Sequence, residues 1–90
     1  MKAIITVLGR DRVGIIAEVC TFLSERQVNI LDISQTIVQG YFNMLMIVDL
    51  GEEAAARFEQ TAADLRALGK ASALEIKLQH EAIFNGMHRI

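Results

Sequence analysis

The chain of 90 residues contains no proline, no tryptophan and a single cysteine. One cysteine, Cys20, excludes a disulfide within the chain, so the fold must rest on a hydrophobic core, and a reducing, cytoplasmic location is expected. No apolar run approaches the ~18 residues that a membrane-spanning helix needs, and the first residues lack the pattern of a secretory leader. The sequence therefore predicts one small domain without a membrane segment.

The net charge is small, because nine Lys and Arg stand against eleven Asp and Glu, which gives −2. Such a balance argues against direct nucleic-acid binding, which depends on basic surfaces. Hydrophobic residues are abundant instead, at 52%, and the mean hydropathy is +0.33. This excess is high for a small monomer, so we expect part of the surface to be buried in a homodimer or a higher homo-oligomer.

Four segments have the composition of β-strands. Residues 2–8 and 41–50 are apolar on both faces, as central strands of a sheet are. Residues 30–39 and 72–79 alternate between apolar and polar side chains, which is typical of half-exposed edge strands. Gly40 separates the second strand from the third and predicts a hairpin.

Two helices are expected between these strands. The first is predicted from Val13 to about Gln27, and the second opens at Glu52 with acidic residues that favour a helix N-terminus. Gly69 is predicted to end the second helix as a left-handed cap.

The first helix carries two apolar flanks on opposite sides. The flank expected to face the core consists of Val13, Ile16, Ala17, Cys20 and Leu23. The other flank consists of Ile15, Val19 and Phe22. A surface helix needs only one apolar stripe, so the second flank is predicted to be a subunit interface. Packing under a loop or under the C-terminal tail is the alternative.

The order of elements is β-α-β-β-α-β. Right-handed crossovers place the first and third strands in the centre of an antiparallel sheet and both helices on one face. The fold class is therefore α+β, with a ferredoxin-like sandwich over residues 1–80. Residues 81–90 are predicted to form a short helical tail that packs on the domain or on a partner subunit.

Residues suited to catalysis or metal binding are sparse. Cys20 is expected to be a buried core thiol, and neither His80 nor His88 has an acidic or nucleophilic partner at a useful spacing. His80, Glu81 and His88 would gather around a metal only if the tail folded back or two chains contributed. We therefore expect no enzyme activity, no cofactor and no metal site.

The stretch between the first strand and the first helix is the candidate site. A strand that turns directly into a helix presents unpaired N–H groups and a positive dipole end, which suit a carboxylate. Asp11 or Asn29 would accept hydrogen bonds from an ammonium group. The alternative is a purely structural turn, in which Gly9 lets the chain turn, Asp11 caps the helix and Gly14 allows close packing on the sheet. The pattern alone leaves both open.

The motif Gly9-Arg10-Asp11-Arg12-Val13-Gly14-Ile15, followed by Asn29-Ile30, resembles the ACT domain over nearly the whole chain. The chain is similar to small free-standing bacterial proteins with one ACT domain, and to the ACT halves of the glycine-cleavage repressor. The resemblance implies a non-catalytic regulatory module that binds a small ligand, an amino acid, at a homodimer interface. By position, Gly9 to Ile15 would contact the ligand from one subunit, and Asn29 and Ile30 from the other. The alternative is a ligand-free dimerisation or protein-interaction adaptor that acts on a protein partner in metabolic or transcriptional regulation.

Overall fold

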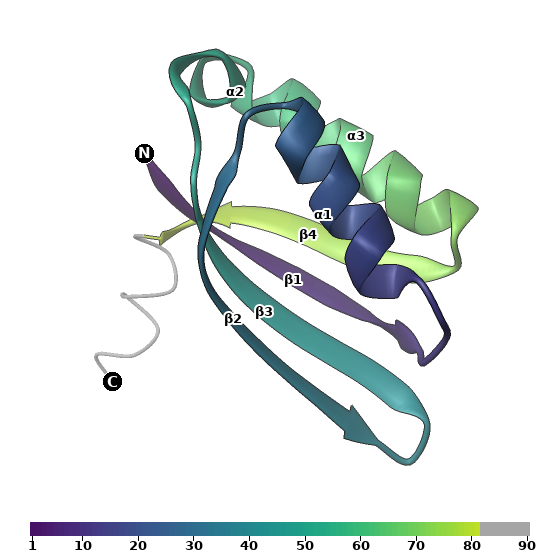
Figure 1. The fold of residues 1–90 in the computed structure, drawn as a ribbon. Helices are drawn as coiled ribbons and strands as arrows, with labels where there is room; N and C mark the ends of the chain where they lie inside the picture. The colour runs from purple at the N-terminus through teal and green to yellow at the C-terminus, as the bar shows by residue number, and fades with distance from the viewer. Residues whose placement is uncertain (82–90) are drawn as a thin grey trace.

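The computed structural model describes residues 1–81. The elements in chain order are β1 (Lys2–Arg10), α1 (Ile15–Glu25), β2 (Asn29–Val38), β3 (Tyr41–Asp49), α2 (Glu52–Ala56), α3 (Phe58–Ala71) and β4 (Leu74–His80). The strands form one antiparallel sheet in the order β2-β3-β1-β4, and the helices cover one of its faces (Figure 1). This confirms the predicted ferredoxin-like fold. Apart from Glu81, the predicted C-terminal tail lies outside the described residues.

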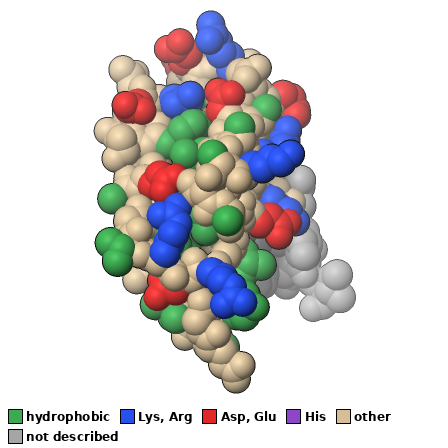
Figure 2. Space-filling view, turned by 90° about the vertical axis from the view of Figure 1, so that its right-hand side faces the viewer, with side chains coloured by type: hydrophobic (Ala, Val, Ile, Leu, Met, Phe, Trp, Pro, Cys, Tyr) green, Lys and Arg blue, Asp and Glu red, His purple; other side chains and the backbone are tan. Residues whose placement is uncertain are grey.

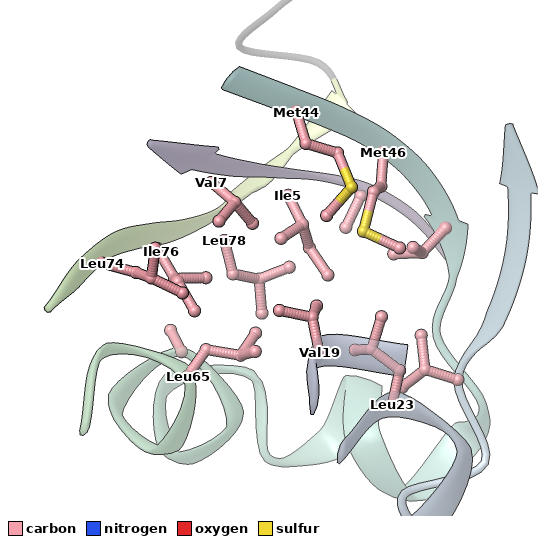
Figure 3. Packing of buried hydrophobic residues seen from close by; sticks show 14 of the residues in the cluster. Ile5, Val7, Val19, Leu23, Met44, Met46, Leu65, Leu74, Ile76 and Leu78 are labelled. Atoms are coloured by element: carbon pink, nitrogen blue, oxygen red, sulfur yellow. The ribbon is translucent and has the colours of Figure 1, made fainter. Parts of the chain in front are cut away.

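The core lies between the sheet and the helices. On the central strand β1, Ile5 is paired with Met46 of β3 and with Leu78 of β4, so alternate residues of three strands point to the same face. Figure 3 shows Val19 and Leu23 of α1 and Leu65 of α3 directed toward this apolar face. The fully buried members of the core are Ile5, Val7, Ile15, Val19, Leu23, Met44, Met46, Val48, Leu65 and Ile76.

Helix α1 is rotated on the sheet relative to the prediction, although Leu23 is buried as expected. Ile15 and Val19 are 2% and 0% exposed and belong to the chain's own core, so the predicted subunit contact through them is wrong. Phe22 is half-buried against the same core, and its ring lies 3.8 Å from the guanidinium of Arg26. Ile16, which was expected to point inward, is 38% exposed. The two apolar flanks have similar hydrophobicity, so the sequence pattern does not distinguish them. The angle at which the chain enters α1 decides which flank packs against the sheet.

The second predicted helix is divided in two. Its chain turns at Arg57, whose φ of −114° and ψ of 41° are not helical, so α2 and α3 are separate helices. Thr61 of α3 is buried, and its hydroxyl donates a hydrogen bond to the carbonyl of Ala54 across this break, at 3.5 Å. Gly69 lies inside α3, which continues to Ala71, so the predicted left-handed cap at Gly69 is wrong. A side chain at Gly69 would lie only 2.6 Å from the carbonyl oxygen of Leu74, so this glycine permits close packing of α3 on β4.

The strand β2 is the exposed edge of the sheet. The helices lie over the other strands, and the β2–β3 hairpin extends beyond them (Figure 1). Every residue of β2 is exposed except Ile30, which is half-buried. The pairing of β2 with β3 shifts between Ile30 and Asp32, which leaves Leu31 as a bulge. The exposed apolar residues of this strand are Leu31, Ile33, Ile37 and Val38.

Candidate ligand-binding site

The turn from β1 to α1 is held by its neighbours on two sides. The backbone N–H of Asp11 donates to the carbonyl of Gly40, at 2.9 Å, which joins this turn to the tip of the β2–β3 hairpin. On the other side, a Cβ at Gly9 would come within 2.6 Å of the Leu74 side chain. Gly14 has a φ of +92°, a left-handed conformation that side chains disfavour. The turn is therefore a fixed platform between the hairpin and the α3–β4 connection.

The helix that follows begins without a side-chain cap. Gly14 is the N-cap residue of α1, and Asp11 does not cap the helix, contrary to the structural interpretation of the turn. The first helical hydrogen bond runs from the N–H of Glu18 to the carbonyl of Gly14, at 2.9 Å. The N–H groups of Ile15, Ile16 and Ala17 precede this bond and have no acceptor within the helix. These donors, together with the positive end of the helix dipole, suit a carboxylate group.

A recess of about 480 Å³ lies beside these donors. Its walls come from the β1–α1 turn, from the start of α1 and from the β2–β3 hairpin. The lining residues are Asp11, Arg12, Gly14, Ile15, Ile16, Ala17, Gln35, Ile37 and Phe42. Figure 2 views the molecule from the side on which the β1–α1 turn lies in Figure 1, and it shows acidic, basic and hydrophobic side chains interspersed there. The recess can therefore offer both charges and apolar surface to one small molecule.

Arg12 is tied to the helix by Glu18. A guanidinium nitrogen of Arg12 donates to one carboxylate oxygen of Glu18 at 2.8 Å, and the hydroxyl of Ser72 donates to the other oxygen. The hydrogen bond from Ser72, and then that from Arg12, lower the pKa of Glu18 below its ordinary value of 4.5. Glu18 thus links the turn that lines the recess to the connection between α3 and β4.

Replacing Glu18 with Gln should make the free energy of unfolding less dependent on pH below neutrality. Because the pKa of Glu18 is lowered in the folded chain, its stabilising contribution is complete above the unfolded value of 4.5 and is lost as the pH falls through the folded value. Thermal unfolding followed by circular dichroism from neutral pH down to about pH 3 measures this loss. Below pH 4.5 the wild-type chain should lose more stability than E18Q does. Equal acid sensitivity in both chains would show that the Glu18 contacts do not form in solution.

Only some of the predicted site residues of the turn line the recess. Asp11, Arg12, Gly14 and Ile15 line the recess, as expected of a site built on the turn. Arg10 lies on β1 with its guanidinium 5.3 Å from the ring centroid of Tyr41. The other residues of the motif lie outside the lining: Gly9 packs against Leu74, and Val13 is 97% exposed.

Asn29 and Ile30 lie at the far end of α1 from the turn. They line a second groove, of about 450 Å³, together with Cys20, Ser24, Gln27 and Val28. Within one chain they are therefore separate from the recess. A single subunit does not bring the two predicted halves of the site together.

The hairpin residues of the recess were absent from the sequence prediction. Gln35, Ile37 and Phe42 come from the ends of β2 and β3 that meet at the hairpin tip. The antiparallel pairing of Arg10 with Tyr41 brings this tip beside the β1–α1 turn. The predicted strand order placed the hairpin tip beside the turn, but it did not specify which hairpin side chains line the recess.

Two negative findings apply to residues 1–81. No helix in this part of the chain is long and apolar enough to cross a membrane. The same residues contain no group of three His, Cys, Asp or Glu side chains placed to hold a metal ion. His88, a member of the alternative metal site, lies outside the described residues.

Comparisons with known proteins agree with this architecture. Residues 2–79 match the family model described as an ACT domain. A UPF0237 protein from Bifidobacterium longum is 56% identical over 89 residues, which cover 99% of this chain and 98% of the relative. The solved structure of an ACT domain protein from Streptococcus pneumoniae superposes with a TM-score of 0.82 at 40% identity, covering 93% of each chain.

A more distant solved structure extends the relationship. A putative glycine cleavage system transcriptional repressor superposes with a TM-score of 0.75 at 28% identity, covering 87% of this chain and 44% of the repressor. The match therefore involves less than half of that protein, whereas the UPF0237 relative is matched over almost its full length. The chain belongs to the ACT domain family, and it is similar to UPF0237 proteins over almost its full length.

Proposed function

We propose that this chain is a regulatory module, without catalytic activity, that binds an amino acid in the recess beside the β1–α1 turn. The observation that carries the proposal is the pairing of free N–H donors at Ile15, Ile16 and Ala17 with the carboxylate of Asp11 in one recess. The donors suit the carboxylate of an amino acid, and Asp11 suits its ammonium group. ACT domains are generally regulatory modules that bind small ligands, which supports this role.

We place the ligand at a homodimer interface formed by the β2 edges of two copies. The outer edge of β2 has no strand partner in the described part of the chain, and it carries exposed Leu31, Ile33 and Ile37. Such an edge is a ready template for pairing with another strand. Two copies of one strand pair antiparallel about a two-fold axis, with directly opposed residues on the same face of the sheet. An axis through Ser34, near the middle of β2, satisfies this requirement.

This pairing brings the two halves of the site together. With Ser34 on the axis, Ile33 of the second copy lies opposite Gln35, and the bulged Leu31 of that copy follows farther along the strand, toward the end that carries Ile37. Asn29 and Ile30 of the second copy then approach the end of β2 that lines the recess. The dimer thus explains why the two predicted halves lie at opposite ends of α1 in one chain. It also covers apolar surface, in agreement with the mean hydropathy of +0.33.

Calorimetric titration of the purified chain with each of the twenty common amino acids tests the proposal. At least one amino acid should bind, with one site for each chain. Replacing Asp11 with Asn should weaken binding by about tenfold, because a neutral amide loses the charge-assisted hydrogen bond to the ligand ammonium group. Glu59→Gln is the matched control, since Glu59 is also an exposed acid but lies on α3, outside the recess. Wild-type affinity in D11N would remove Asp11 from the site.

The second candidate function is an adaptor that dimerises without a ligand and acts on a protein partner. The exposed apolar edge of β2 favours this function as well, because it promotes self-association independently of the recess. The same titration separates the two. A chain that is dimeric by sedimentation and silent toward every amino acid would support the adaptor. Under either function we place the protein in the cytoplasm, where its free Cys20 would stay reduced.

A further inference from the structure

We infer that the ligand is an amino acid with an uncharged aliphatic side chain of three or four carbons. This inference rests on the proposed function, because it concerns the same recess. It goes further by assigning different parts of the ligand to different walls. The backbone groups of the ligand face the turn, and its side chain faces α1 and the hairpin.

The wall away from the turn is mainly apolar, with Gln35 as its one polar side chain. Ile16 of α1, Ile37 of β2 and Phe42 of β3 all line the recess. Ile16 and Ile37 remain 38% and 56% exposed in the single chain, whereas Phe42 is buried and forms part of the core. The two isoleucines therefore have apolar surface to cover, and an aliphatic side chain between them would remove it from water.

The charges of the recess lie only on the turn. Asp11 and Arg12 are the sole charged residues of its lining, and Glu18 already pairs with Arg12 at 2.8 Å. Gln35 is the one polar side chain that the hairpin contributes, and it is neutral. A ligand side chain with a carboxylate or an ammonium group would lose hydration there without gaining an ionic partner. The recess therefore disfavours acidic and basic amino acids.

The second copy strengthens the same preference. In the proposed dimer, Ile33 and the bulged Leu31 of the second copy approach the end of β2 that lines the recess, and both bring further exposed apolar surface. Charge and apolar lining thus favour the same class of ligand.

Titration with a graded series of amino acids tests this inference. Each buried methylene group should tighten binding about fourfold, so leucine should bind roughly fiftyfold more tightly than alanine, with 2-aminobutyrate and norvaline between them. Serine, aspartate and lysine should bind no better than alanine. Equal affinities along the series, or a preference for aspartate or lysine, would overturn the inference and leave the proposed function standing. Silence toward every amino acid would overturn both.

Substitutions in the apolar wall of the recess test whether the ligand side chain binds there. Ile37→Ser should weaken leucine binding about tenfold and leave alanine binding nearly unchanged, because only the longer side chain reaches this wall. Val38→Ser is the matched control, since Val38 is 63% exposed and points to the opposite face of the same strand. Ile16→Ser should weaken leucine binding to a similar extent. Because Ile16 lies on α1 and not on the pairing strand β2, this loss would come from the recess and not from altered strand pairing. Wild-type leucine affinity in both I37S and I16S would overturn the inference.

Discussion

Replacing Ile33 with Glu is expected to convert the proposed homodimer into a folded monomer. Ile33 lies near the middle of β2, is 40% exposed and stands one residue from the proposed two-fold axis. Two glutamates near this axis would lose hydration and repel each other, and the apolar contact of Ile33 would be lost. These terms together should cost about 3 kcal/mol, which raises the dimer dissociation constant more than a hundredfold. Sedimentation velocity over a range of concentrations measures this change.

The opposite edge of the sheet supplies the control for this experiment. Gln79→Glu places a new carboxylate on β4, at an exposed position of the other edge strand. This variant should remain a dimer, and circular dichroism should show that both variants are folded. A dimeric I33E would contradict pairing through β2. If only Q79E dissociated, the result would indicate that the dimer interface lies at β4.

Replacing Gly69 with Ala should lower the free energy of unfolding by about 3 kcal/mol. The new Cβ would lie 2.6 Å from the carbonyl oxygen of Leu74 and 3.0 Å from Ile76, so α3 and β4 must move apart. Helix propensity alone predicts the opposite, because Ala is better than Gly in a helix by about 1 kcal/mol. For a domain of this size the loss corresponds to a decrease in Tm of roughly 15 °C, measured by thermal unfolding.

The neighbouring position separates packing from helix propensity. Lys70→Ala changes an exposed residue of the same helix turn, and its free energy of unfolding should stay within about 0.5 kcal/mol of the wild-type value. A Tm of G69A above that of the wild-type chain would show that propensity outweighs the contact. The sheet and α3 would then tolerate a wider separation than the structure shows.

Periodicity failed at α1 for an identifiable reason. It correctly located the helix and its two apolar stripes, but it assigned Ile16 to the core and Ile15 and Val19 to the surface. A helical stripe specifies an angle about the helix axis, and nothing local relates that angle to the sheet. The left-handed φ of Gly14 and the hydrogen bond from Asp11 to Gly40 fix how the chain enters α1. The hydrogen bond depends on the β2–β3 hairpin, which lies far along the sequence.

The candidate site was likewise found in part. The motif identified the turn, because its glycines and Asp11 are contiguous in sequence and closely spaced. It could not reveal Ile37 and Phe42, because they join the recess only when β3 pairs with β1 and brings the hairpin beside the turn. Strand pairing joins residues that are distant in sequence, and local patterns carry little information about such contacts.

The sequence by itself determined the order of the elements, the central and edge strands, the family and the turn, because strand alternation, helical spacing and a short motif are local properties. Only the tertiary structure decided which flank of α1 is buried, where α2 separates from α3, why Gly69 has no side chain, and which side chains complete the recess. Each of these depends on the distance between elements that are remote in sequence, such as the 2.6 Å that a Cβ at Gly69 would leave to the backbone of Leu74. Close packing fixes such distances, and only the assembled core sets them.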